Sequence, residues 1–407
     1  MIDTITNGYA RLDRRLDPVR SALDPLRRPF IGPNTVGASW SFWAGFVALV
    51  VLAVAYPLFA GQYPAYQDAQ FIAYAFLGVS LALVWGYGGI LSFGQVAFFG
   101  AAGYAFGVIT INFASPLGIT VGVVASVAIG ALLAALLGYF MFYGGVTEVY
   151  VTIITLVTSL VLHTFMAQTA GDEWTIGSAA LGGFNGMPDI PAFELGAGPV
   201  AVAITNARYY WFVLALFVVT FLGLRWLVNS DFGRVAVAVR EDEDRTRMFG
   251  YDVRRVKLLV FTLGGALAGL GGVLNTAWGS YVSPDVFSLS FAALPVVWVS
   301  VGGRKSLIGA TVGTLAVAWG NRWLSINLPD FALIAIGTLL VVTILFFPDG
   351  VVPRVADGWP RIVAGVRSLP GRIRRLPSTV RRMPQLVRDK LGSTPLRADG
   401  DGEVTDR

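Results

Sequence analysis

The chain of 407 residues is 55% hydrophobic and only 14% charged, with a formal net charge of +5 and a mean hydropathy of +0.66. Soluble domains carry about 25% charged residues, so a chain this apolar points to lipid as the solvent for much of its surface. The chain has no cysteine and a single histidine, His163, which excludes disulfides, thiolate metal sites and multi-histidine metal sites. We predict no catalytic residue, cofactor or metal.

The N-terminal tail, residues 1–39, carries six arginines between Arg11 and Arg28. Apolar residues recur in it at steps of three and four, which predicts an amphipathic helix on the inner membrane surface, bent at Pro18 and Pro25. A disordered basic tail is the alternative. The first apolar stretch starts too late and is too long for a cleavable signal peptide.

Ten hydrophobic segments follow, which predict an all-α integral membrane protein, a polytopic bundle of about ten transmembrane helices. They span residues 40–60, 69–87, 93–113, 117–142, 149–168, 209–228, 257–278, 290–302, 307–321 and 331–347. The eighth and ninth are shorter than the roughly 20 residues that a straight span needs, so we expect tilted, broken or re-entrant helices there.

The basic residues give an orientation. If ten helices alternate and both termini are cytoplasmic, only Arg208 and Arg322 of the 30 Lys and Arg residues lie outside. This asymmetry is what the positive-inside rule describes. We therefore predict a multi-pass protein of a prokaryotic cell (plasma or inner) membrane with a permease domain at residues 40–347.

The most distinctive segment, residues 86–100, reads GYGGILSFGQVAFFG. Its glycines allow close backbone approach or a broken helix whose freed amides and carbonyls face a pore. Ser92 and Gln95 add hydrogen-bonding groups at the join of two apolar segments. A tight turn with small-residue packing is the alternative. The pairs Gly103/Gly107, Gly265/Gly269 and Gly309/Gly313 also predict close helix packing.

Two loops outside the spans are long enough to receive partners. The predicted cytoplasmic loop, residues 229–256, has mixed charges and a central stretch that predicts a short helix ending at Gly250. A solvated loop is the alternative. The predicted periplasmic loop, residues 169–208, has four acidic residues and one basic residue.

The C-terminal tail, residues 348–407, repeats a Leu-Pro or Met-Pro pair every seven residues from Leu369. Ten basic and two acidic residues lie between Arg354 and Lys390. Because prolines at this spacing oppose a regular helix, we expect a disordered tail or a basic strip on anionic membrane lipid. Nucleic acid is disfavoured, since no aromatic residues interleave the basic ones.

The chain lacks the G-x-x-x-x-G-K-[ST] phosphate loop, so no ATP hydrolysis can be assigned to it. Polar residues are sparse in the spans, and Thr155 and Asn275 are candidates for a translocation path. No row of intramembrane charges suggests an ion relay.

At residues 86–99 and 240–285 the sequence resembles the permeases of branched-chain amino acid (leucine-isoleucine-valine type) ABC importers, which include related urea and amide permeases. The first stretch is similar to the family form G-x-x-G-x-[LI]-S-x-G-[HQ]-x-x-F-F. The second contains REDE at 240–243, GYDV at 250–253, KLL at 257–259, ALAGLGG at 266–272 and SPD at 283–285. The resemblance covers residues 69–347.

The resemblance implies a permease subunit that hydrolyses no ATP. Its expected partners are a second homologous permease, two cytoplasmic ATP-binding subunits and a periplasmic solute-binding protein. It also implies a helix broken near the midplane. The expected translocation path contains Gly89, Ser92, Gly94, Gln95, Thr155 and Asn275, and the expected ATPase-coupling loop contains Arg240, Glu241, Glu243 and Gly250.

The substrate implied is a branched-chain amino acid, with urea or a short amide as the alternative. Gln95 carries this ambiguity, because many amino acid permeases have histidine there and urea or short-amide permeases often have glutamine. An ion-coupled secondary transporter is the alternative from another class.

Overall fold

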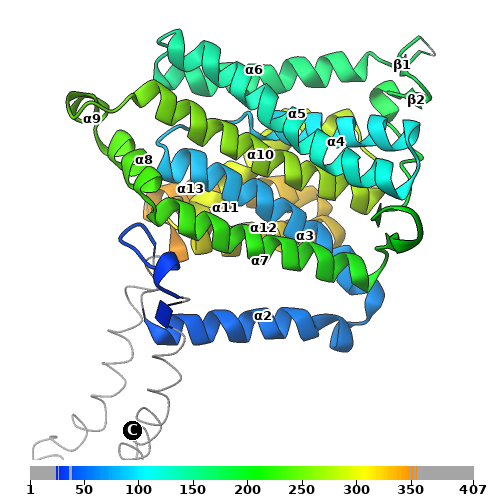
Figure 1. The fold of residues 1–407 in the computed structure, drawn as a ribbon, viewed down its shortest axis with the longest axis horizontal. Coiled ribbons are helices and arrows are strands. Elements are labelled where there is room, and N and C mark those ends of the chain that lie inside the picture. The colour runs from blue at the N-terminus through cyan, green and yellow to red at the C-terminus, as the bar shows by residue number, and fades with distance from the viewer. Residues whose placement is uncertain are drawn as a thin grey trace, which may run out of the picture. The chain divides into compact units, whose positions relative to one another are not determined.

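A computed structural model describes residues 24–25, 27–35, 39–171, 173–347, 350–352 and 354 (Figure 1). The predicted amphipathic helix at residues 11–28 lies mostly outside the described residues, and the repeat in the C-terminal tail lies wholly outside them. The helices are α2 Trp40–Ala60, α3 Gln62–Leu81, α4 Gln95–Asn112, α5 Pro116–Tyr143, α6 Glu148–Ala167, α7 Ala207–Asn229, α8 Asp231–Glu241, α9 Glu243–Met248, α10 Val253–Gly279, α11 Leu289–Gly302, α12 Leu307–Asn327 and α13 Pro329–Phe346.

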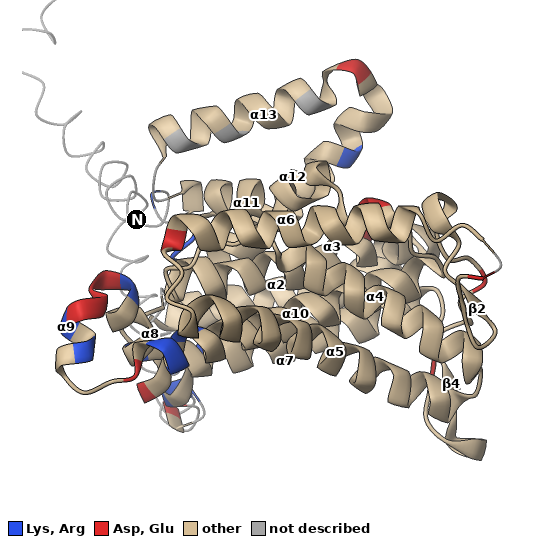
Figure 2. Cartoon of the chain, turned by 90° about the horizontal axis from the view of Figure 1, so that it is seen from above, with Lys and Arg blue, Asp and Glu red and all other residues tan. Residues whose placement is uncertain are grey.

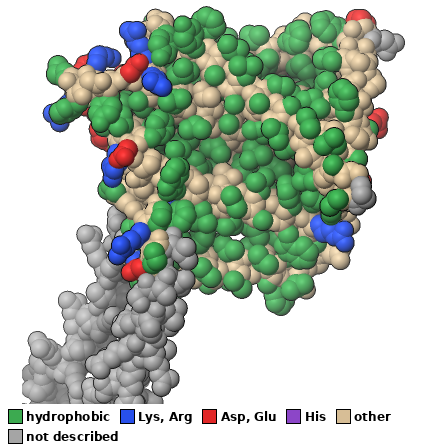
Figure 3. Space-filling model, viewed as in Figure 1, with side chains coloured by type: hydrophobic (Ala, Val, Ile, Leu, Met, Phe, Trp, Pro, Cys, Tyr) green, Lys and Arg blue, Asp and Glu red, His purple; other side chains and the backbone are tan. Residues whose placement is uncertain are grey.

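Helices α2, α4, α5, α6, α7, α10 and the continuous α3–η2 (Ala82–Tyr87) are, among the described residues, the seven long and apolar enough to cross a membrane. Helices α11 and α13 are shorter apolar helices, and α11 contains Pro295. Each of the ten predicted segments coincides with a helix, although α12 continues to Asn327, six residues beyond its predicted end. Hydrophobic side chains spread across the face seen in Figure 3, as expected of a multi-pass membrane protein.

Short polar side chains set several helix starts. Ser115 accepts a hydrogen bond from the backbone N–H of Gly118, and Pro116 occupies the first position of α5. Asp252 caps α10 by accepting from the N–H of Arg255. Such caps satisfy amide groups that the first helical turn leaves without partners.

Helix α10 packs against α3, α4 and α5 at the centre of the bundle. Glycines allow this approach. A Cβ built on Gly265 would lie 2.2 Å from the Cβ of Ala134, and one on Gly272 would lie 1.9 Å from the carbonyl oxygen of Phe99. A Cβ on Gly309 would meet the backbone of Gly302 at 2.4 Å. The predicted small-residue interfaces at Gly265/Gly269 and Gly309/Gly313 are therefore confirmed as close helix contacts.

Charged residues gather in α8 and α9, at one end of the bundle (Figure 2). We call this the charged end. The loop between α7 and α10 thus forms two helices, where the sequence predicted one.

At the opposite end lie four two-residue strands, β1 Thr175–Ile176, β2 Ala179–Ala180, β3 Glu194–Leu195 and β4 Val202–Ala203, paired as two antiparallel hairpins. An isolated bridge between Met187 and Val282 joins this loop to the connection after α10. We call this the hairpin end.

A short N-terminal segment, residues 28–35, docks at the charged end. Arg225, buried in α7, donates from Nε to the Phe30 carbonyl oxygen at 2.7 Å and lies over the rings of Phe42 and Trp43. Asn34 donates to the Val228 carbonyl oxygen at 2.7 Å. The tail predicted at residues 1–39 is therefore attached to the bundle over this short stretch.

Candidate functional site

The connection between α3 and α4 is a helix break that turns back into the bundle. Helix α3 continues through the π-helical turn η2, which ends at Tyr87, and α4 begins at Gln95. Gln95 pairs with Ser80, which lies seven residues before Tyr87 on the same helix. Seven residues of helix span roughly 10 Å, so residues 88–94 run back along α3 by about that distance. Irregular backbone at membrane depth needs this kind of enclosure by protein.

Gln95 is buried at the inner end of the break. Its Oε1 accepts from the Ser80 hydroxyl at 2.7 Å, and the same hydroxyl lies 2.8 Å from the Gly264 carbonyl oxygen. The Gln95 Nε2 is buried without a hydrogen-bond partner. Because Ser80 has one proton, it serves only one of its two acceptors at a time. If the amide were reversed, Nε2 could donate to Ser80 while Ser80 donates to Gly264, but the other amide atom would then lack a partner. The Gln95 amide therefore keeps hydrogen-bonding capacity to spare in either orientation.

Helix α6 closes the side of the break. A Cβ on Gly94 would lie 2.9 Å from the Cβ of Thr155, whose own hydroxyl donates to the Thr152 carbonyl oxygen at 2.9 Å. Thr152 Oγ1 lies 3.0 Å from the Leu91 carbonyl oxygen, to which it can donate. The Ser92 hydroxyl accepts from the N–H of Gly94 at 3.1 Å. The break is thus held by hydrogen bonds and by the absence of a side chain at Gly94.

The start of the break, where η2 ends, contacts α8. The Arg240 guanidinium donates from Nη1 to the Gly86 carbonyl oxygen, and Gly89, at φ +78°, packs on the Arg240 side chain. The break runs from Gly86, at the charged end, to the buried Gln95, because η2 carries α3 on to Tyr87. The position near the membrane midplane that the resemblance implied stays a prediction.

Four of the six predicted path residues therefore lie in the break or at its end, namely Gly89, Ser92, Gly94 and Gln95, and a fifth, Thr155 of α6, packs against it. Asn275 lies elsewhere. Its Oδ1 accepts from Gln70 Nε2 at 3.3 Å, and Gln70 also donates to the Tyr74 hydroxyl at 3.0 Å. Asn275 follows Gly264 by eleven residues on α10, which is roughly 16 Å towards the hairpin end.

Two of the four predicted coupling residues contact the bundle, and the other two are exposed or have open surroundings. Arg240 faces the break, and Glu243 forms an ion pair with Lys257 at the start of α10. Gly250, at φ +89°, has no atom within 4 Å of a built Cβ. Glu241 is exposed, and its pKa is lowered mainly by its hydrogen bond with Arg240 and to a smaller extent by the positive charges of Arg240 and Lys305.

The end of α9 and the residues that follow it form an exposed apolar tip. Met248 is 87% exposed and Phe249 is 76% exposed, and Tyr251 beside them is also exposed. We call Met248, Phe249 and Tyr251 the α9 tip. It extends the charged loop rather than an apolar span, so lipid contact along a spanning helix does not account for it.

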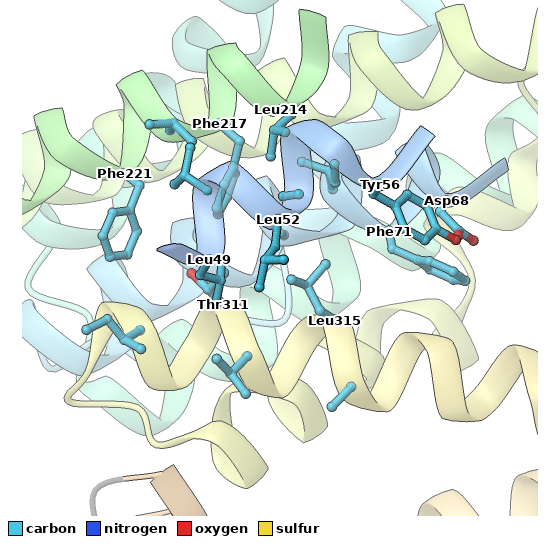
Figure 4. Close-up of a pocket in the computed structure, with 18 of the residues that line it drawn as sticks. Leu49, Leu52, Tyr56, Asp68, Phe71, Leu214, Phe217, Phe221, Thr311 and Leu315 are labelled. Atoms are coloured by element: carbon cyan, nitrogen blue, oxygen red, sulfur yellow. The ribbon is translucent and has the colours of Figure 1, made fainter. Parts of the chain in front are cut away.

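A separate apolar groove of about 730 Å³ lies between α2, α3, α7 and α12 (Figure 4). Aliphatic and aromatic side chains such as Leu52, Phe217 and Leu315 line it. Its carboxylate, Asp68, accepts from the Tyr56 hydroxyl at 2.5 Å. None of the predicted path residues lines this groove, so it is distinct from the break.

Sequence reasoning missed Ser80, Gln70 and Tyr74, which supply the partners of Gln95 and Asn275. The only sequence signal that could have indicated these residues was their polarity, because each is a polar side chain inside the apolar segment 69–87 or at its start. Nothing in the spacing of these residues indicates which partner each would meet, since Ser80–Gln95 and Gln70–Asn275 cross between helices.

Comparison with known proteins adds a family. Residues 66–344 match the family described as the permease component of branched-chain amino acid transport systems. The chain is 25% identical, over 80% of its length and 78% of the relative's, to the high-affinity branched-chain amino acid transport system permease protein LivM of Escherichia coli. A probable LivM of Methanocaldococcus jannaschii is 24% identical over 43% of this chain and 53% of its own.

A ribose import permease protein, RbsC of Escherichia coli, is 28% identical over 51% of this chain and 61% of its own length. No solved structure matches. The family match covers the break, the two helices of the charged end and the last apolar helices together. The chain is therefore a multi-pass membrane protein that belongs to the family of permease components of branched-chain amino acid transport systems.

Proposed function

We propose that the chain is a membrane permease subunit of an ATP-driven ABC importer and forms, with a second homologous permease, the translocation path for branched-chain amino acids. In this proposal the protein has ten spans and cytoplasmic termini in a prokaryotic inner membrane, so that the charged end lies in the cytoplasm and the hairpin end lies outside. The gathering of Lys and Arg residues at the charged end supports this orientation.

The observation that carries the proposal is the α9 tip. Met248 and Phe249 are exposed at the end of a charged six-residue helix, which Glu243 ties to Lys257 of α10. Exposed apolar side chains with a polar surround are typical of protein–protein contacts. A cytoplasmic ATP-binding subunit is the partner that an importer permease requires at this end. We infer that the tip enters a pocket of that subunit.

The substrate assignment rests on the relatives and on Gln95. The relatives named LivM favour branched-chain amino acids, while the relative named RbsC shows that similar chains serve a sugar importer. Urea or a short amide is the alternative, because an amide side chain with hydrogen-bonding capacity to spare suits another amide. A solute-binding protein is expected to dock at the hairpin end, over the loop that follows α6.

The test is reconstitution of the chain in liposomes with the permease, the ATPases and the solute-binding protein encoded beside it. We expect uptake of leucine, isoleucine or valine that requires ATP and all partners. Met248→Glu with Phe249→Glu should abolish co-purification of the ATPases. Phe184→Glu, at a side chain 70% exposed at the hairpin end, is the matched control and should keep them bound. Uptake by the chain alone, driven by an ion gradient, would overturn the proposal in favour of a secondary transporter.

A further inference from the structure

Arg240 differs from the other basic residues of the loop between α7 and α10 in the direction of its side chain. The Arg240 side chain is 17% exposed, whereas that of Arg234, six residues earlier on α8, is 57% exposed. Arg234 pairs with Asp231 on its own helix. Arg240 instead reaches out of α8 to the α3–α4 break.

Two contacts fasten Arg240 to the break. Its Nη1 donates to the Gly86 carbonyl oxygen, in the last turn before the helix ends. A Cβ on Gly89 would lie 3.0 Å from Cγ and 3.2 Å from Cα of Arg240, so backbone and side chain are in direct contact there. Glu241 accepts from Nε at 3.0 Å and from Nη2, which leaves Nη1 directed at Gly86. A guanidinium bonded on two sides has a defined orientation, which a lysine cannot reproduce.

The break has little room to absorb a displacement of α8. On the other side of Gly86, a built Cβ would lie 1.8 Å from the Arg304 carbonyl oxygen, in the connection between α11 and α12. Eight residues further along, Gly94 lies against Thr155 and Gln95 is bonded to Ser80. Packed interiors do not deform continuously. A shift of the backbone at Gly86–Gly89 must therefore either displace residues 90–94 as well or break these contacts.

We propose that Arg240 is the positioning residue that links the ATPase-contacting loop to the α3–α4 break, so that movement of α8 displaces the backbone beside Gln95. This inference rests on the proposed function. It assigns contact with the ATPase to the α9 tip, and transfer of the movement of α8 to the break to Arg240. Arg240 is then no part of the ATPase interface, and its role in the ATPase-coupling loop that the resemblance implied is to transmit movement inward.

The chain has no cysteine, which allows a direct test. Ser92→Cys places a near-isosteric thiol at a buried position inside the break. In the reconstituted complex, we expect the rate of labelling of this thiol by a small maleimide to change at least about fivefold between the nucleotide-free and ATP-bound states, about 1 kcal/mol by the tenfold-per-1.4 kcal/mol relation. Adding Arg240→Ala should make the two rates equal, and Arg240→Lys should restore only part of the difference. Arg234→Ala is the matched control and should preserve the full change.

Three outcomes separate the possibilities. Nucleotide-dependent labelling that persists in Arg240→Ala overturns the inference and leaves the importer function standing. Loss of ATPase co-purification in Arg240→Ala places Arg240 in the interface and also overturns it. A parent chain that binds no ATPase at all contradicts the proposed function instead, before Arg240 is tested.

Discussion

Lys257, at the start of α10, forms an ion pair with Glu243 of α9, and its ammonium also lies 4.0 Å from Glu148 at the start of α6. The Lys257 side chain is largely buried, while that of Glu243 is partly exposed and that of Glu148 is exposed. One cation thus ties the helix that carries the α9 tip to two helices of the bundle.

Glu243→Gln should loosen α9 from α10 while leaving the spans folded. Partly exposed pairs contribute up to about 1 kcal/mol, so we expect ATPase affinity to fall about three- to fivefold. Binding of purified ATPase to the permease in nanodiscs measures this. Asp244→Asn, at an exposed residue paired with Arg247, is the control and should change affinity little. A double-mutant cycle with Lys257→Met should give a coupling energy, and strict additivity would show that the pair has no role in docking.

Gly94→Ala should destabilise the break. The new methyl group would lie 2.9 Å from Thr155 Cβ and 3.2 Å from the Thr155 carbonyl oxygen. Overpacking of this kind costs about 1–3 kcal/mol, so we expect a lower unfolding temperature together with lost transport. Thermal unfolding in detergent measures the first. Gly223→Ala on α7, where nothing lies within 4 Å, is the control and should be neutral or slightly stabilising. Unchanged stability in Gly94→Ala would mean that α6 can move away from the break.

Gln95→Leu should retain the fold and impair transport. Ser80 can still donate to the Gly264 carbonyl oxygen after the amide is lost, so no hydroxyl is stranded. A lost hydrogen bond of about 0.5–1.5 kcal/mol corresponds to a decrease of up to about tenfold in kcat/KM for uptake. Gln95→His should shift the preference among leucine, urea and short amides. If rate and preference both stay at the parental values, Gln95 is a packing residue.

We expect protonation of Glu241 to have no effect on transport in mildly acidic buffer. Arg240 lowers the pKa of Glu241. The carboxylate therefore stays charged until the pH falls below the ordinary pKa of a glutamate. The pairing is therefore present at neutral pH and is lost only as pH falls through the lowered pKa. Solute transported per ATP should stay constant from about pH 8 to about pH 5. A decrease in this range that Glu241→Gln abolishes would assign the sensitivity to this pair and contradict the expectation.

Much of the fold could be predicted from the sequence because lipid imposes apolar helices, and each predicted segment coincides with a helix in the structure. The site was only partly predictable. Glycine density at residues 86–100 marked the break, yet the pairs Ser80–Gln95 and Arg240–Gly86 join residues 15 and 154 positions apart. Such contacts depend on how helices are arranged in three dimensions, which periodicity in a single chain does not encode. The same limit explains Asn275, which was grouped with Gln95 by polarity but lies with Gln70.

The docking of residues 28–35 on α7 limits how the chain can be shortened. The family match begins at residue 66, inside α3, which would suggest that the residues before α2 are among those dispensable for expression. A protein that starts at Trp40 would remove the Phe30 carbonyl from the buried Arg225 guanidinium and the Asn34 amide from Val228. Taking a hydrogen-bond partner from a buried cation is costly, so the shortened chain should be produced in lower yield. Boundaries for crystallisation or display should therefore be drawn upstream of Arg27.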